Sequence, residues 1–305
     1  MSKLSLAVEI SGLRLRNPVM LSAGILGLSA PLLRRVYESG AGAVVTKSIG
    51  SRPRSGHPNP TVVAVDCGLL NSMGLPNPGV DEFSEEVRSL KRWGVTVVAS
   101  IFGEEAEEYV EVAEKLSEAG ADALEINCSC PNVREVGLLG QDPGMVEEVT
   151  RAVKGAVDVP VFTKLTPNVT RIGEVARAAE RGGADGVTAI NTLRAMAVDV
   201  ETCRPILSNV TGGLSGPAIK PVALRCVWEV AESVEIPVIG CGGILTWRDA
   251  VEFLLCGASA VQVGTAIMYR GLGVFQEIIQ GIEAYLRRKG FGGVEEVVGR
   301  AHGAA

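Results

Sequence analysis

Histidine is scarce in this sequence, and its scarcity narrows the chemistry that the chain can perform. Only two histidines, His57 and His302, occur among 305 residues. Histidine is the side chain that most often serves as a general acid or base in enzymes. An enzyme built on this chain is therefore predicted to move protons with another residue type.

Several other features are also missing. Aromatic residues make up only 4% of the chain, and 35 acidic against 29 basic residues give a net charge of −6, which excludes the basic surface of a nucleic-acid-binding protein. No apolar run reaches the roughly 18 residues of a membrane span, and residues 1–10 do not predict a signal peptide. The seven cysteines are odd in number and lack the spacing of a disulfide framework, which predicts a reducing, cytoplasmic location.

The apolar residues, 47% of the chain, are ample for a folded core, and two short signatures divide them into segments. Gly-Ala pairs close helical patterns at residues 40–41, 120–121, 183–184 and 257–258. Glycine is common just past a helix end because it adopts the left-handed conformation at little cost. Short segments that contain Pro18, Gly94, Pro160 or Pro237 open apolar runs. The alternation predicts eight strands near residues 19–23, 43–48, 95–101, 123–129, 160–166, 186–191, 237–241 and 260–264.

Eight strands that alternate with helical patterns, such as the amphipathic stretch 104–119, predict a (β/α)8 TIM barrel that spans residues 1–305 as one domain. An open doubly wound sheet explains the count of eight less well. Residues 4–16 are predicted to form a β-hairpin that plugs the bottom of the barrel. Insertions are predicted after strands 2, 4 and 6; the long stretches 50–80 and 192–216 lie on the face where barrel enzymes keep their active sites.

Polar residues stand at the carboxyl ends of the predicted strands. The second strand ends in Lys47, the fourth in Asn127, the fifth in Lys164 and the sixth in Asn191. A lysine inside an apolar strand costs free energy unless an anionic group accompanies it. Two such lysines together with amides at matching strand ends predict a site for an anionic ligand.

The ends of the last two strands predict a phosphate site. Gly242 and Gly243 follow the seventh strand, and Gly264 and Thr265 follow the eighth. Barrel enzymes often bind phosphate at this position, and small residues let backbone N–H groups approach the phosphate oxygens. The predicted ligand is a phosphorylated cofactor or substrate.

The segment Asn127-Cys-Ser-Cys-Pro-Asn132 carries the candidate base. The two cysteines do not predict a metal site, because no third and fourth ligands accompany them at suitable spacing. Cys130 lies just past the strand and leads into a loop, where nearby positive charge can lower a thiol pKa. With histidine scarce, Cys130 is predicted to transfer the proton. Five other cysteines are predicted to be small buried apolar residues: Cys67, Cys203, Cys226, Cys241 and Cys256.

Five ordered segments give the chain a specific resemblance to a known family. They are Leu70-Asn-Ser-Met-Gly-Leu-Pro-Asn-Pro-Gly79, the segment with Cys130, Lys164-Leu-Thr-Pro-Asn168, Ile190-Asn-Thr192 and Thr211-Gly-Gly-Leu-Ser-Gly-Pro-Ala-Ile-Lys-Pro221. The chain resembles the class 1 dihydroorotate dehydrogenases, flavoproteins of pyrimidine (UMP) biosynthesis. The last segment is most similar to the class 1B, NAD-linked catalytic subunit rather than to the fumarate-using class 1A enzymes. The membrane-attached class 2 enzymes are disfavoured because their base is serine.

The resemblance implies one FMN per chain and a substrate-binding site. Cys130 matches the family's base, which removes a proton from C5 of dihydroorotate while hydride leaves C6 for the flavin. The matching substrate-binding positions are Lys47, Asn71, Ser72, Met73, Gly74, Leu75, Asn127, Asn132, Asn191 and Thr192. The matching FMN-binding positions are Ser22, Lys47, Ser48, Ser100, Asn127, Lys164, Ile190, Gly216, Gly242, Gly243, Gly264 and Thr265. Lys164 would lie near the flavin edge where reduction develops negative charge.

Ser100 departs from the family pattern, which usually has an asparagine at that position. The loop at 134–140 also lacks the polar, Gly-rich sequence that is common in the family. The chain also has no dinucleotide fingerprint and no iron–sulfur cysteine motif. If the chain is a class 1B subunit, electrons pass to NAD through a partner subunit that carries FAD and a [2Fe-2S] centre. The resemblance therefore implies a homodimer or a heterotetramer with that partner; fumarate is the alternative acceptor.

Three other functions compete with this hypothesis. A related flavin-dependent dihydropyrimidine dehydrogenase would act on a ring without a carboxylate, and Lys47 argues for the carboxylated ring. A Schiff-base lyase would use Lys164 as its nucleophile. A non-catalytic binding barrel is the third alternative, which the polar strand ends disfavour.

Overall fold

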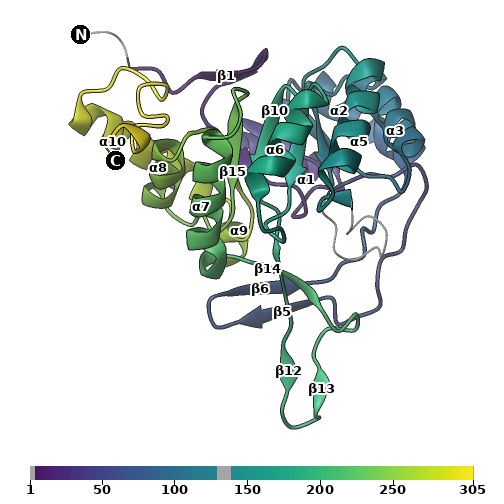
Figure 1. Cartoon of the computed structure of the whole chain (residues 1–305). Coiled ribbons are helices and arrows are strands. Elements are labelled where there is room, and N and C mark those ends of the chain that lie inside the picture. The colour runs from purple at the N-terminus through teal and green to yellow at the C-terminus, as the bar shows by residue number, and fades with distance from the viewer. Residues whose placement is uncertain (1–3, 129–138, 305) are drawn as a thin grey trace.

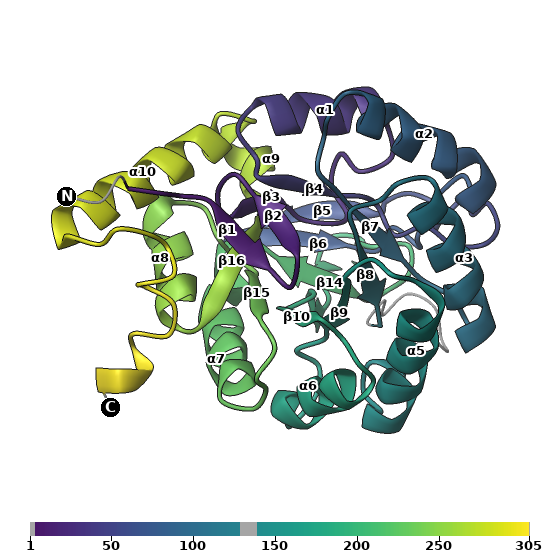
Figure 2. The same ribbon diagram turned by 90° about the horizontal axis from the view of Figure 1, so that it is seen from above.

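The computed structural model describes residues 4–128 and 139–304. In these residues, eight parallel strands close into a barrel, seen along its axis in Figure 2. The strands pair in chain order around the barrel: β3 (Val19–Leu21), β4 (Ala43–Val45), β7 (Val97–Ile101), β8 (Ala123–Asn127), β9 (Val161–Leu165), β10 (Gly186–Ala189), β15 (Val238–Cys241) and β16 (Ala258–Val263). The predicted TIM barrel and all eight predicted strand positions are confirmed.

Helices form a ring around the strands (Figure 2). The main ones are α1 (Ala30–Glu38), α2 (Val80–Arg92), α3 (Ala106–Glu118), α5 (Pro143–Ala156), α6 (Ile172–Arg181), α7 (Lys220–Ala231), α8 (Trp247–Leu255) and α10 (Val274–Lys289). Short helices are α9 (Ala266–Arg270), η1 (Pro217–Ile219) and η2 (His302–Ala304). In α3 the buried side chains Tyr109, Val112 and Leu116 recur at helical spacing, as the amphipathic pattern predicts. None of the helices in the described ranges combines the length and the apolar character needed to cross a membrane.

The predicted N-terminal hairpin is present and closes one end of the barrel. Strands β1 (Val8–Ile10) and β2 (Leu13–Leu15) pair antiparallel and lie across the barrel in Figure 2. Ile10, Leu13 and Leu15 pack in one buried cluster with the inward side chains of the barrel, which include Phe162 and Ile239. The hairpin therefore keeps water out of the barrel at this end.

The two long insertions meet in one antiparallel sheet at the other end of the barrel (Figure 1). The insertion after β4 supplies β5 (Val62–Val65) and β6 (Gly68–Asn71), and the insertion after β10 supplies β11 (Leu193–Ala195) and β14 (Gly212–Ser215). Asn71 pairs with Gly213, although 142 positions separate them in the sequence. A small hairpin of β12 (Val198–Asp199) and β13 (Arg204–Pro205) projects from this sheet. The third predicted insertion, after β8, falls largely outside the described residues.

Candidate active site

A cavity of about 380 Å³ lies at the carboxyl ends of the barrel strands, where the inserted sheet also contributes to its wall. Val62, Leu69 and Asn71 come from the insertion after β4, and Ser215 comes from the insertion after β10. The volume is within the range of small-molecule and cofactor sites. The cavity therefore lies where barrel enzymes carry out their chemistry.

Most of the predicted site residues line this one cavity. They are Ser22, Lys47, Ser48, Asn71, Met73, Gly74, Leu75, Asn127, Lys164, Ile190, Asn191, Thr192, Gly216, Gly242, Gly243, Gly264 and Thr265. The predicted base Cys130 and its neighbour Asn132 lie outside the described residues. The barrel thus brings together residues from seven of its strand ends and from both insertions.

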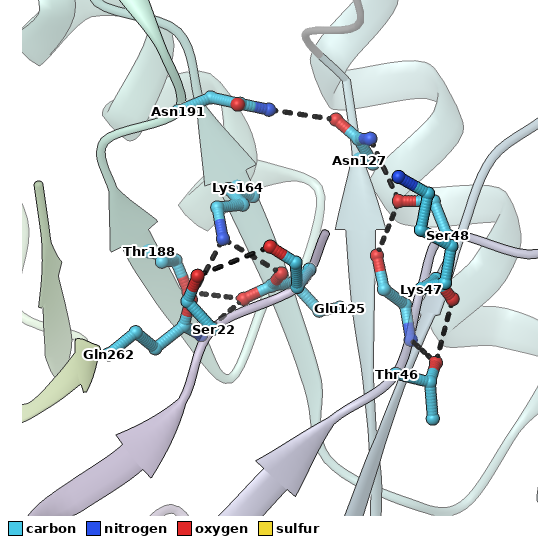
Figure 3. Close-up of polar contacts among 12 residues, drawn as sticks. Ser22, Thr46, Lys47, Ser48, Glu125, Asn127, Lys164, Thr188, Asn191 and Gln262 are labelled. Carbon is cyan, nitrogen blue, oxygen red and sulfur yellow. Dashed lines mark hydrogen bonds and ion pairs between the residues drawn. The ribbon is translucent and has the colours of Figure 1, made fainter. Parts of the chain in front are cut away.

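A chain of polar contacts crosses part of the cavity wall (Figure 3). The Asn191 amide donates to Asn127 Oδ1 over 3.2 Å, and the Asn127 amide donates to Ser48 Oγ over 2.9 Å. Lys47, also drawn in Figure 3, is buried, with only 8% of its surface exposed. These contacts fix the orientation of both amides in the cavity wall.

Two predicted site residues, Ser72 and Ser100, do not line the cavity. Both side chains are fully buried. Ser100 Oγ lies 2.9 Å from Ser48 Oγ, directly behind the cavity wall. Ser72 Oγ lies 3.1 Å from Nδ1 of His57, beneath the lining segment 73–75. We therefore expect both serines to act through their neighbours rather than by direct contact with a ligand.

Beneath the cavity, Lys164 belongs to a buried polar cluster that Figure 3 shows in full. Lys164 Nζ donates to Gln262 Oε1 over 2.8 Å and to Glu125 Oε1 over 3.2 Å. Glu125 Oε2 accepts from Gln262 Nε2 over 2.6 Å and from Thr188 Oγ1 over 3.0 Å. Burial by itself lowers the pKa of Lys164, but the charge and hydrogen bond of Glu125, together with Cys241, outweigh burial, and the net direction is upward.

Three members of this cluster, Glu125, Thr188 and Gln262, were not predicted from the sequence. The signal for Glu125 was available, because the residue interrupts the apolar run of β8. A charge in a strand that is buried on both faces needs a partner. Glu125 and Lys164, opposite charges in neighbouring buried strands, are therefore expected to pair with each other.

Glycines form the part of the wall predicted to hold phosphate. Gly216, Gly242 and Gly243 have φ values of 95°, 131° and 77°, a region that side chains rarely adopt. A Cβ atom on Gly243 would lie only 2.8 Å from the Gly216 carbonyl oxygen, and one on Gly264 would lie 2.7 Å from Ser22 Oγ. A larger residue at any of these positions would strain or fill the wall. The bare backbone suits the close approach of a phosphate group.

Asp249 anchors the turn that carries two of these glycines. Its carboxylate accepts from the backbone N–H groups of Leu245 and Thr246, over 3.0 and 2.7 Å, and from Lys220 Nζ over 2.7 Å. Burial acts to raise the pKa of Asp249, but the hydrogen bonds from Lys220, Thr246 and Leu245 together outweigh it and lower that pKa. The turn at 242–246 is therefore fixed from behind by a carboxylate that stays ionised.

Comparison with known proteins identifies the family. The sequence model of the family described as dihydroorotate dehydrogenase matches residues 5–286. The chain belongs to the dihydroorotate dehydrogenase family. The family resemblance predicted from the sequence motifs is confirmed, because this match covers most of the chain.

Curated relatives and a solved structure agree with the family. The chain is 53% identical over 297 residues to a Pyrococcus abyssi protein, with 97% of this chain and 99% of the relative covered. It is 52% identical over 300 residues to a Methanosarcina mazei protein, with 97% and 95% covered. Both are named dihydroorotate dehydrogenase B (NAD(+)), catalytic subunit. The dihydroorotate dehydrogenase of Eimeria tenella, solved in complex with ferulenol, superposes with a TM-score of 0.86 at 25% identity, covering 97% of this chain and 88% of that one.

The cysteines of this dihydroorotate dehydrogenase fold differ in how deeply they are buried. Cys226 is buried as predicted, whereas Cys67 and Cys203 are exposed, so the prediction that they are core residues is wrong. Both precede or follow strands of the insertions rather than the barrel, which is why neither is covered. Cys241 lines the cavity, and burial raises its pKa. Within residues 4–128 and 139–304, no cluster of ligating side chains suits a metal ion.

Proposed function

We propose that this chain oxidises dihydroorotate to orotate in pyrimidine biosynthesis, with FMN as its cofactor. The observation that supports this most is a single cavity lined by two lysines, Lys47 and Lys164, and by the amides of Asn71, Asn127 and Asn191. One lysine suits the substrate carboxylate and the other suits the cofactor. Family membership and the names of the relatives support the same activity.

Lys47 is the proposed partner of the substrate carboxylate. It is nearly buried, and a charge held away from water interacts more strongly with an opposite charge than an exposed one does. Amides from Asn71, Asn127 and Asn191 can both donate to and accept from the polar edges of a pyrimidine ring. The related ring without a carboxylate, as in a dihydropyrimidine dehydrogenase, would leave Lys47 without this partner.

The cavity residues fit FMN. Gly216, Gly242, Gly243, Gly264 and Thr265 would hold its phosphate, because their backbone is open to the cavity. When bound, FMN supplies the acceptor for the hydride that leaves C6 of dihydroorotate. Lys164 would lie beside the flavin edge that gains negative charge on reduction, and its ammonium group would stabilise that charge.

Cys130 is the proposed base for the proton on C5. Cys128, two residues earlier, is fully buried, and burial raises its pKa to about 12, so it stays protonated near neutral pH. The pKa of Cys241 in the cavity wall is raised as well. Both thiols are thus poorly suited to accept a proton, which supports the assignment to Cys130.

We further propose that electrons leave the reduced chain for NAD through a partner subunit that carries FAD and a [2Fe-2S] centre. The relatives are named as the catalytic subunit of an NAD(+)-linked enzyme, which supports a partner subunit. A homodimer, alone or within a heterotetramer, is the proposed assembly. Addition of fumarate to the chain reduced by substrate tests the alternative acceptor, since fumarate should leave it reduced.

An anaerobic spectrum tests the proposed activity. The purified chain should be yellow, and dihydroorotate should bleach it while dihydrouracil should not. Bleaching by dihydrouracil alone would favour the dihydropyrimidine dehydrogenase. A colourless protein that borohydride traps with its substrate would favour the Schiff-base lyase. The ion pair of Lys164 with Glu125 opposes that lyase, because a protonated amine is not a nucleophile.

A further inference from the structure

Among the residues that the structure describes, Glu125 is the one acidic residue that is fully buried. It lies below the cavity rather than in its wall. Its side chain has no exposed surface, whereas its partner Lys164 lines the cavity. The carboxylate therefore cannot contact a ligand in the cavity, but the ammonium group of Lys164 can. Figure 3 shows the lysine between the carboxylate and the amides of the cavity wall.

Hydrogen bonds hold both charges of this pair in place. Glu125 accepts from Lys164, Thr188 and Gln262, and Gln262 also accepts from Lys164. An ammonium group has three N–H donors. Glu125 and Gln262 take two of those of Lys164 within the described residues, so the third is left for the cavity that Lys164 lines.

The charge of Lys164 depends on Glu125. A buried lysine without a negative partner loses its proton readily, because burial penalises the charged form. The groups that face Lys164 from the neighbouring strands are Glu125, the neutral Thr188 and Gln262, and Cys241. The thiol of Cys241 stays protonated near neutral pH, since burial raises its pKa. Glu125 is thus the negative charge that offsets the burial of Lys164.

We propose that Glu125 is a positioning residue that keeps Lys164 protonated in both redox states of the bound flavin. Two-electron reduction of the flavin then takes up one proton, at the flavin itself, and the lysine supplies a charge that is already present. Without the Glu125 charge, Lys164 is neutral beside the oxidised flavin and binds a second proton when the flavin gains negative charge. This inference rests on the proposed function, because it requires a flavin next to Lys164.

The slope of the flavin midpoint potential against pH gives the number of protons that the protein and flavin take up on reduction. For a two-electron couple, one proton changes the potential by about 30 mV per pH unit and two protons by about 60 mV. Redox titration of the FMN-loaded chain between about pH 7.5 and about pH 9.5, below the ordinary lysine pKa, should give about 30 mV per pH unit for the unaltered protein. The Glu125→Gln variant should give about 60 mV per pH unit.

Two further variants identify the group that takes up the second proton. Thr188→Val removes one hydrogen bond to Glu125 but leaves its charge, so the slope should stay at about 30 mV per pH unit. In the double variant Glu125→Gln with Lys164→Met there is no lysine to titrate, and the slope should return to about 30 mV per pH unit. A double variant that keeps the steeper slope would show that the second proton is not on Lys164, and would overturn the inference.

The remaining outcomes separate this inference from the function on which it rests. An unaltered protein with the two-proton slope overturns the inference without any variant having to fold. A Glu125→Gln variant with the one-proton slope overturns it as well, and the proposed function survives if dihydroorotate still reduces the unaltered protein. A chain that binds no FMN would contradict the proposed function and, with it, the inference.

Discussion

Removal of the Lys164 ammonium group alone should destabilise the protein more than removal of both charges of its buried pair. The side chains of Lys164 and Glu125 are 5% and 0% exposed, and their charged atoms lie 3.2 Å apart. Loss of one partner from a buried ion pair costs about 3–5 kcal/mol, because the other charge is left buried without compensation. Thr188 and Gln262 still donate to Glu125 in Lys164→Met, so we expect a cost near the lower end, about 3 kcal/mol.

This cost translates into a measurable change of melting temperature. A chain of 305 residues has an unfolding entropy of about 0.6 kcal/mol per kelvin near its midpoint. A loss of about 3 kcal/mol therefore lowers the Tm of Lys164→Met by about 5 °C. The double variant Lys164→Met with Glu125→Gln leaves neither charge buried, and its Tm should fall by no more than about 2 °C.

Scanning calorimetry of the FMN-free proteins at a single scan rate measures these differences. Lys115→Met is the matched control, because Lys115 forms ion pairs with Asp81 and Glu111 at the surface, and such pairs are worth about 1 kcal/mol or less. Loss of both pairs should lower its Tm by less than about 3 °C. Two results would contradict this prediction: a Tm of Lys164→Met equal to that of the unaltered protein, or a Tm of the double variant as low as that of Lys164→Met.

Three further predictions concern the cavity and its support. Lys47→Ala should raise the KM for dihydroorotate at least about 30-fold in steady-state assays, equivalent to about 2 kcal/mol for loss of a buried charge partner; an unchanged KM would remove Lys47 from the substrate site. Cys130→Ala should stay yellow but lose most flavin reduction by dihydroorotate near neutral pH, and Cys130→Ser should recover activity only at raised pH; near-normal reduction in Cys130→Ala would refute the base. Asp249→Asn should cost about 1 kcal/mol at neutral pH, because it weakens the capping box that Asp249, at N3, forms with the N-cap residue Thr246. Because the pKa of Asp249 is lowered by folding, its contribution is present above the unfolded value of about 3.9 and is lost as the pH falls through the lower folded value, so urea midpoints of Asp249→Asn and the unaltered protein should converge in acid.

The fold could be predicted because its signals are local. Each barrel strand is a short apolar run, and a glycine or proline next to it marks where the run begins. The carboxyl ends of parallel strands meet at one end of a barrel, so the positions of Lys47, Asn127 and Lys164 along the sequence suffice to assign them to one site. The N-terminal hairpin was predictable for the same reason, since Ser11-Gly12 separates two short apolar segments.

The inserted sheet could not be predicted, because its pairing is not local. Nothing in the residues around Asn71 indicates that the strand will pair with Gly213 rather than with its own hairpin alone. The meeting of the two insertions completes the cavity wall, with Leu69 and Ser215 on neighbouring strands. Side-chain direction was equally hidden: Ser72 and Ser100 lie in the predicted segments, yet each points into the protein behind the wall.

The central claim is that this cavity oxidises dihydroorotate with a bound flavin, and single-turnover stoichiometry tests it most directly. The FMN-loaded chain is mixed anaerobically with excess dihydroorotate, and the bleached flavin and the orotate formed are both measured. We expect rapid bleaching with about one orotate formed per flavin, because each two-electron oxidation delivers one hydride to one cofactor. Flavin that stays oxidised, or bleaching without orotate, would contradict it.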